Sequence, residues 1–514
     1  MGKTKAAGGT VSDRYPGAWL TLMMVLCAAY AARHWFIYDG FIDATRDEAI
    51  YLPAILRNSD PALYAKDFFV THFQVASGLF LRVSSALLSL AGGDYRLFLL
   101  GSSTALLFIF TSGVFFLVRS LSGSSAAALL SGLLLIRPRS AMAGVGFPVY
   151  LGNYQPRIFI DALTPWFFLG FLKAESRSGF LLLGASLGFV SWFYPVYPLQ
   201  LAAFFMLLAV FRKRVPGALF LGLGFTAFFA PYYSRDILHG AGAITPETAR
   251  ILAWRNGDMF YPQAGAIFTQ FVNNFSLPLA LALAGTAAIS REVRAQWPVR
   301  VLLFSFYAVT ALLAASFLSY IFSPLGQVLL QRSGRLYHFI FLITGAIGAA
   351  ALFGEKGKTV HKALYACLIT ATFIITDPQA LFNMPVQKNP HVVYEFPKAE
   401  FLAVAEKAGR LTPPDAIFLI PPDGYNNFSI YAKRGIVVSY KTLSSLGDPA
   451  IIKRWYDTYN SVRAAYASGD INELRAAAHE YSADYILVRN GSFAAADTPV
   501  IKTDEFTVYK ADPR

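Results

Sequence analysis

Long apolar segments alternate with short polar turns over the first three quarters of the chain. A run of about 17–25 apolar residues is long enough to cross the hydrocarbon core of a bilayer as a helix. Eleven segments approach this pattern, and they predict a polytopic α-helical membrane protein with about eleven spans. These segments are 17–38, 97–118, 122–136, 157–172, 179–194, 197–212, 216–233, 263–290, 301–322, 335–353 and 363–376.

One further apolar stretch, 74–91, is predicted to be an interfacial or re-entrant helix. Arg82 lies at its centre, where a charge inside a bilayer is costly. If this stretch stays on the outer surface, the basic turns all fall on one side, as expected for cytoplasmic loops. We therefore expect a cytoplasmic N-terminus and an extracytoplasmic C-terminus. The turns placed inside contain Lys3, Lys5, Arg119, Lys173, Arg177, Arg212–Arg214, Arg291, Arg294, Arg300, Lys356, Lys358 and Lys362.

The pattern changes after Asp377 to an alternation of amphipathic helices and short buried strands, which is typical of a small α/β domain. The chain is thus predicted to consist of a transmembrane bundle over 1–376, with a long first external loop at 39–73, and an extracytoplasmic domain over 377–514. Helices are expected at 397–410, 449–466 and 471–482, and strands at 416–420, 436–440, 484–489 and 506–510, with a turn at 421–424.

Composition agrees with a membrane protein. Hydrophobic residues make up 55% of the 514 residues and charged residues only 15%, where a soluble protein has about 25% charged residues. A soluble enzyme, a disordered protein and a nucleic-acid binder are thereby excluded. The net charge of +13 belongs to the bundle, because residues 377–514 contain 15 basic and 16 acidic side chains. Cys27 and Cys367 lie in apolar segments, so no disulfide framework is expected.

The first external loop carries an acidic pair, Asp47 and Glu48, just outside the first span. One of them could act as a general base that takes a proton from an attacking hydroxyl or amine. Alternatively, the pair only begins a surface helix, whose N-terminus favours anions.

A second candidate is the sequence from Tyr154 to Asp161. Pro156 begins a span, and Arg157 and Asp161 are four residues apart on one face of its outer end. A carboxylate one turn inside a bilayer indicates a functional role. The alternative is an Arg157–Asp161 pair that only neutralises itself.

A third candidate is the basic group Arg332, Arg335 and His338, which leads into the tenth span. At the depth of the headgroups these side chains could stabilise a phosphate leaving group, or they could simply anchor the end of the helix. Lys66 and Arg255 of the outer loops, together with Arg157 and Tyr154, complete the predicted substrate-binding set.

The arrangement of these motifs resembles the GT-C superfamily of membrane glycosyltransferases. The resemblance rests on the first-loop sequence Asp47-Glu48-Ala-Ile-Tyr51, on Arg157 and Asp161 entering a span, on Arg332 and Arg335 late in the bundle, and on a soluble C-terminal domain. It implies that Asp47 is the catalytic base, that Asp161 assists, and that Arg332 and Arg335 hold a polyprenyl phosphate. Pro53 interrupts the helix that usually follows the acidic pair, and a Trp-Trp-Asp-type acceptor motif is absent from the sequence.

The sequence therefore predicts an inverting membrane glycosyltransferase, located in the bacterial inner (plasma) membrane. It would transfer a sugar from a polyprenyl-phosphate donor to a lipid, glycan or protein acceptor on the extracytoplasmic face. A divalent cation, Mg²⁺ or Mn²⁺, near Asp47 and Asp161 is compatible with the sequence but not required by it. Two alternatives remain open, a lipid-linked-glycan flippase or transporter and a non-catalytic membrane scaffold.

Overall fold

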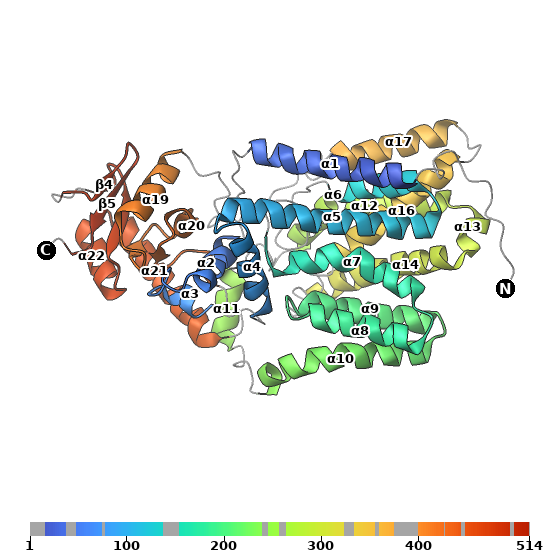
Figure 1. The fold of residues 1–514 in the computed structure, drawn as a ribbon, viewed down its shortest axis with the longest axis horizontal. Coiled ribbons are helices and arrows are strands. Elements are labelled where there is room, and N and C mark those ends of the chain that lie inside the picture. The colour runs from blue at the N-terminus through green and yellow to red at the C-terminus, as the bar shows by residue number, and fades with distance from the viewer. Residues whose placement is uncertain are drawn as a thin grey trace.

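The computed structural model shows a bundle of long helices with a smaller α/β domain at one end (Figure 1). A layer of short helices lies between these two parts. The structure describes residues 16–37, 48–73, 78–136, 154–238, 245–255, 264–322, 334–354, 359–374, 399–425, 427–443, 448–493 and 498–512.

Each of the eleven predicted apolar segments coincides with a helix of the bundle. Within the described residues, two helical segments, Tyr95–Ser122 and Leu336–Phe353, are long and apolar enough to cross a membrane by length and composition. The helices are therefore confirmed, while the number of spans stays a prediction. They are α1 (Pro16–Ile37), α5 (Tyr95–Ser122), α6 (Ser125–Ile136), α7 (Pro156–Lys173), α8 (Arg177–Val190), α9 (Val196–Phe211), α10 (Val215–Leu238), α12 (Ala264–Ala288), α14 (Trp297–Phe322), α16 (Gly334–Gly354) and α17 (Thr359–Ile374).

Local sequence explains where the longest of these helices begins and ends. The Asp94 carboxylate accepts hydrogen bonds from the backbone N–H groups of Arg96 and Leu97, which caps the N-terminus of α5. At the other end Gly123 adopts φ 70°, a left-handed conformation that favours glycine. The 28 residues between these caps form a helix of about 42 Å, which exceeds the thickness of a bilayer core.

Small residues bring α8 and α10 into close backbone contact. A Cβ atom added at Gly184 of α8 would overlap the carbonyl oxygen of Leu221, and one added at Gly224 of α10 would overlap that of Leu181. This is the packing expected where helices associate without a hydrophobic driving force. Small residues also bring α12 and α16 into close contact, where Gly285 lies against Gly348.

The outer surface of the bundle is apolar. Leu182 on α8 is 70% exposed, Leu219 on α10 is 65% exposed, and Leu364 on α17 is also exposed. Exposed apolar side chains spread over several helices are unfavourable in water, so this surface is suited to contact lipid.

The layer between the bundle and the C-terminal domain comes from two segments that connect bundle helices (Figure 1). The segment between α1 and α5 supplies α2 (Glu48–Ser59), α3 (Phe68–Thr71) and α4 (Leu79–Leu90), and the segment between α10 and α12 supplies α11 (Pro246–Arg255). The short basic helix α13 (Arg291–Ala295) lies at the opposite end of the bundle. The predicted helix at 74–91 corresponds to α4, which carries an exposed Arg82 and packs against α2 and α5. Its placement on a membrane surface stays a prediction.

The C-terminal domain contains a five-stranded sheet in the order β2-β1-β3-β5-β4. Strand β1 pairs in parallel with β2 and with the central strand β3, and β5 is antiparallel to β3 and β4. This mixed sheet and its helices form the predicted α/β domain, although the boundary at 376/377 falls outside the described residues. The elements are α19 (Ala399–Leu411), β1 (Ile417–Leu419), α20 (Phe428–Ala432), β2 (Gly435–Ile436), α21 (Pro449–Ser468), α22 (Ile471–Glu480), β3 (Tyr485–Arg489), β4 (Ile501–Lys502) and β5 (Phe506–Lys510).

The predicted strand at 436–440 is wrong for most of its length. Strand β2 ends at Ile436, and the chain then bends, because Ser439 and Thr442 hydrogen-bond to each other. The Ser439 N–H donates to the Thr442 hydroxyl (3.1 Å) and the Thr442 N–H to the Ser439 carbonyl (3.2 Å). Helix α20 and strand β4 were not predicted from the sequence, because they are short elements without a clear periodicity.

Candidate functional site

Two of the three predicted catalytic acids, Glu48 and Asp161, belong to α2 and α7 at the end of the bundle that faces the C-terminal domain (Figure 1). Glu48 is the first residue of α2, and Asp161 lies in the second turn of α7. Asp47 directly precedes α2 and is outside the described residues. The structure thus places α2 and the start of α7 at the same end of the molecule.

Asp161 is a deeply buried acid of the predicted site. Its side chain is only 3% exposed, and it lies on α7 between the buried Ile160 and Ala162. Arg157, one turn earlier, is half-buried. A carboxylate placed this deeply in an apolar bundle is costly, so the sequence tolerates it either for a use or for a compensating interaction.

The predicted phosphate-binding residues lie at the start of α16. Arg335 is in its first turn, and His338 is buried with its ring 5.1 Å from that of Phe275. Arg332, which precedes α16, and the side chain of Arg335 lie outside the described part of the chain, so their role in phosphate binding stays a prediction.

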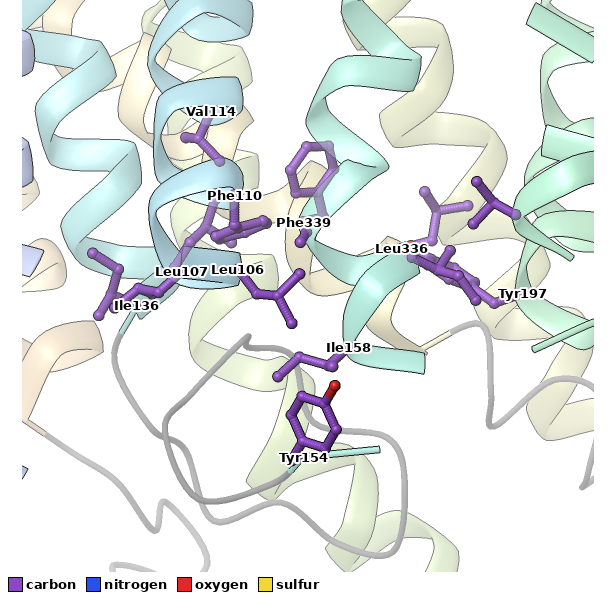
Figure 2. Close-up of a cluster of buried hydrophobic side chains, with 14 of the residues drawn as sticks. Leu106, Leu107, Phe110, Val114, Ile136, Tyr154, Ile158, Tyr197, Leu336 and Phe339 are labelled. Carbon is purple, nitrogen blue, oxygen red and sulfur yellow. The ribbon is translucent and has the colours of Figure 1, made fainter. Parts of the chain in front are cut away.

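Helices α7 and α16 are neighbours in the core. The rings of Phe168 and Phe339 are 5.3 Å apart, and Figure 2 shows Ile158 of α7 in the same buried cluster as Leu336 and Phe339 of α16. A buried carboxylate, Asp161, and a buried imidazole, His338, therefore come from adjacent helices. Side chains of these two types can hold or transfer protons and bind charged groups.

Tyr154 has a structural contact of its own. Its hydroxyl is 3.0 Å from that of Ser84 on α4, and its ring packs against Phe80 and Phe98. Burial raises the pKa of this phenol, so Tyr154 is neutral at physiological pH. It links α4 to the start of α7, and its predicted role in substrate binding remains a prediction.

Lys66 of the first loop contacts the C-terminal domain. Its ammonium group lies 2.7 Å from the carboxylate of Asp415, and both side chains are exposed. The pair raises the pKa of Lys66 and lowers that of Asp415. Lys66 is therefore engaged by a protein carboxylate, and substrate binding by it stays a prediction.

Arg255, at the end of α11, also faces the C-terminal domain. Its guanidinium donates a hydrogen bond to the Leu443 carbonyl (2.9 Å) and lies 5.4 Å from the centre of the Trp455 ring. In return the Tyr440 hydroxyl donates to the Arg255 carbonyl. These contacts give Arg255 a role in joining α11 to the domain, while its predicted role in substrate binding stays a prediction.

Asp67, which was not predicted as a site residue from the sequence, is buried where the first loop meets the C-terminal domain. Its side chain is 1% exposed and accepts hydrogen bonds from the backbone N–H groups of Val70 and Ile436, each at 3.0 Å. Burial raises the pKa of this carboxyl to about 6, and the backbone donors oppose the shift. An aspartate directly before an apolar run is a helix N-cap signal, so the contact with Val70 was visible in the sequence, whereas the contact with Ile436 was not.

An apolar crevice lies deeper in the bundle, between α5, α7, α14 and α16. It is narrow, with room for about one water molecule. None of the predicted site residues whose side chains the structure describes lines it. Its lining includes Leu117, Phe168, Leu302, Ser305, Phe339 and Ile343.

A metal centre is not evident in the part of the chain that the structure describes. No group of three or more His, Cys, Asp or Glu side chains is placed to hold an ion there. Of the two predicted ligands, Asp161 provides a buried carboxylate of the kind that Mg²⁺ binds, and Asp47 lies outside the described residues. The cation therefore stays a prediction.

This chain resembles known proteins in two ways, in the sequence of one segment and in the fold of nearly the whole chain. A family described as a domain of unknown function (DUF6798) matches residues 399–462, within the C-terminal domain. A comparison with curated protein sequences finds no match.

Solved structures give a likeness over nearly the whole chain. The oligosaccharyltransferase of Archaeoglobus fulgidus in its apo form has a TM-score of 0.57 at 11% identity, over 93% of this chain and 70% of that one. The same archaeal enzyme, AglB, in complex with an inhibitory peptide and a dolichol phosphate has a TM-score of 0.55 at 12% identity, with the same coverage. The mycobacterial arabinofuranosyltransferase AftD reaches 0.49 at 15% identity, over 94% of this chain and 35% of that one.

At these identities the likeness concerns the fold. The bundle, the short helices of the first loop and the C-terminal domain together match the archaeal enzyme over 93% of the chain. The resemblance inferred from the first-loop acids, Asp161 and the late arginines is thus confirmed at the level of architecture, and the chain has the GT-C fold of membrane glycosyltransferases.

Proposed function

We propose that this protein is an integral-membrane glycosyltransferase that transfers a sugar from a polyprenyl-phosphate-linked donor to an acceptor. Transfer would take place at the end of the bundle that carries the C-terminal domain, on the extracytoplasmic face of a bacterial inner membrane. The lysine-rich turns, and thus the N-terminus, would then lie in the cytoplasm.

In the proposed reaction an acceptor hydroxyl or amine attacks the anomeric carbon of the donor. The new bond forms as the bond from this carbon to the phosphate oxygen breaks, so the configuration inverts and the electron pair leaves with the phosphate. Asp47 takes the acceptor's proton. Arg332 and Arg335 stabilise the negative charge that develops on the phosphate, and Asp161 orients the acceptor. A divalent cation held by Asp47 and Asp161 would polarise the oxygen atoms around the reacting carbon.

The observation that carries this proposal is Asp161, a buried carboxylate in the second turn of a bundle helix in a chain with the GT-C fold. The apolar outer surface of the bundle supports a donor carried on a lipid. The archaeal enzyme of the same fold was solved with a dolichol phosphate and an inhibitory peptide, which supports the same two classes of ligand for this chain.

The test is a donor-cleavage assay on the purified protein in lipid nanodiscs. A panel of polyprenyl-phosphate sugars is supplied with a membrane extract as the acceptor source, and release of polyprenyl phosphate is measured, so the acceptor need not be known. We expect wild type to cleave at least one donor. Asp161→Asn should lower turnover by about 10²-fold or more if Asp161 acts in the transition state.

The matched control is Asp60→Asn, which changes an exposed carboxylate at the end of α2 and should leave turnover unchanged. Wild-type protein that cleaves no donor of the panel would contradict the proposal. In proteoliposomes, movement of an intact donor across the membrane without cleavage would instead identify a transporter.

A further inference from the structure

The C-terminal domain contacts the part of the first external loop that follows α2, the helix that begins with Glu48. Helix α2 packs against α4 on one side and against α20 of the domain on another. Its residues Leu52, Ile55 and Leu56 are buried. The position of α2 is therefore determined in part by a domain that follows it by more than 300 residues in the sequence.

Three contacts attach residues 64–67, in the segment that follows α2, to the C-terminal domain. The buried Tyr64 hydroxyl donates to the Ser429 carbonyl of α20 at 2.8 Å. Lys66 forms its ion pair with Asp415. The Asp67 carboxylate uses one oxygen to cap α3, through Val70, and the other to accept the N–H of Ile436 in β2.

Among these contacts, the one made by Asp67 is the most demanding. The carboxylate is almost completely buried, and it bridges two backbone N–H groups that belong to different parts of the molecule. Removing it would leave both donors without this acceptor, and an unsatisfied buried donor is costly. The Lys66–Asp415 pair, by contrast, is exposed and contributes less.

We propose that Asp67 is a positioning residue for the proposed transfer reaction. Through the Ile436 N–H it fixes the first loop on the C-terminal domain, and the domain in turn holds α2, which begins at Glu48, in the position that the reaction needs. The inference rests on the proposed function, and it gives the C-terminal domain a task in the reaction.

The first arm of the test follows structure alone. In Asp67→Ala we expect faster amide hydrogen exchange in α2 and in residues 64–71, while exchange in the bundle helix α5 stays unchanged. Asp470→Ala is the matched control, since Asp470 caps α22 of the same domain by accepting from the Asn472 N–H (2.8 Å). Unchanged exchange in α2 of Asp67→Ala would overturn the inference, whatever the protein's activity.

The second arm follows turnover. Asp67→Ala should lower the rate of donor cleavage by about 10²-fold, the size of effect expected when a catalytic group is displaced by about 1 Å, with the KM for the donor unchanged. Asp470→Ala should keep the wild-type rate. Near wild-type turnover in Asp67→Ala, with loosened α2, would show that the contact is only structural and would overturn the inference.

Replacing the hydrogen bond between Asp67 and Ile436 with a disulfide gives a stricter test of the effect on turnover. A Cβ atom added at Gly435 would lie 3.1 Å from the Asp67 Cβ, close to the separation of about 3.5–4.5 Å found in disulfides. It would also overlap the Cδ1 methyl of Ile417, which Ile417→Val removes. The variant Asp67→Cys/Gly435→Cys/Ile417→Val, with the exposed Cys367 replaced by Ser, should be slow when reduced and regain turnover when oxidised.

The matched control lacks only Gly435→Cys and should stay slow under both conditions. A disulfide verified by mass spectrometry that fails to raise turnover would overturn the inference, because the loop is then fixed without effect on the rate. If wild type itself cleaves no donor, the proposed function fails, and the exchange arm still decides whether Asp67 holds α2.

Discussion

Two adjacent carboxylates at the start of α2, Asp47 and Glu48, differ in the chemistry expected of them. Neighbouring residues on a helix point about 100° apart, so only one can face an acceptor. Asp47→Asn keeps the shape of the side chain but removes its ability to accept a proton. We expect turnover to fall by about 10²–10⁴-fold with donor binding retained, and Glu48→Gln to cost less.

Donor cleavage and donor affinity, each normalised to folded protein, check this prediction. If Asp47→Asn keeps near wild-type turnover, Asp47 is not the base, and the fold assignment is unaffected. If the variants lose thermal stability but keep their rate per folded molecule, the acidic pair only stabilises the N-terminus of the helix.

The raised pKa of Asp67 predicts how the stability of the folded protein depends on pH. Burial raises its pKa to about 6 from an ordinary value of 3.8, so between about pH 4 and pH 6 the folded protein keeps a proton that the unfolded chain releases. The stability contributed by this group is fully present below the unfolded pKa and is lost as pH rises through the folded pKa. Linkage puts the loss at about 3 kcal/mol.

The measurement is the apparent Tm of the purified protein between pH 4.5 and 7, compared with that of Asp67→Asn. The amide of this variant cannot titrate, so the Tm of wild type should fall relative to that of the variant as pH rises toward the folded pKa. Two parallel Tm profiles would contradict the assigned pKa.

At the scale of elements, the pairing of α8 with α10 depends on glycines. A side chain at Gly184 would overlap the Leu221 carbonyl, which is backbone and cannot move aside as a flexible side chain could. We expect Gly184→Leu to force the helices apart and to destabilise the protein by about 1–3 kcal/mol or more, as overpacking does.

The control is Gly101→Leu on α5, where an added Cβ meets no atom within 4 Å. Thermal unfolding in detergent, followed by the loss of monodisperse protein, compares the two variants. Equal Tm values for Gly184→Leu and Gly101→Leu would mean that α8 and α10 are not in close backbone contact.

At the scale of the whole molecule, the first loop, α11 and the C-terminal domain share one end of the bundle, and α13 lies at the other (Figure 1). The lysine-rich turns predict that the domain end is outside. In a Cys367→Ser background, an impermeant maleimide should label Asn472→Cys in intact cells but label Lys213→Cys only after permeabilisation, since both positions are exposed. Labelling of both positions, or of neither, from outside would contradict this topology.

The sequence alone determined the helices of the bundle and the class of the C-terminal domain. A long apolar run in a bilayer must satisfy its backbone hydrogen bonds within itself and is therefore a helix, which is why all eleven segments coincide with helices. The strands β1, β3 and β5 were also predicted, because each is a short buried run between polar turns.

Only the tertiary structure decided how these elements meet. Tyr64 contacts Ser429 and Asp67 contacts Ile436 across 365 and 369 residues, a separation at which no periodicity or spacing pairs one residue with another. The predicted roles of Lys66 and Arg255 in substrate binding stay predictions, and only the structure shows that these residues also contact the Asp415 carboxylate and the Leu443 carbonyl of the C-terminal domain. Charge patterning predicts on which side of the membrane a residue lies, and its partner depends on the packing of the folded chain.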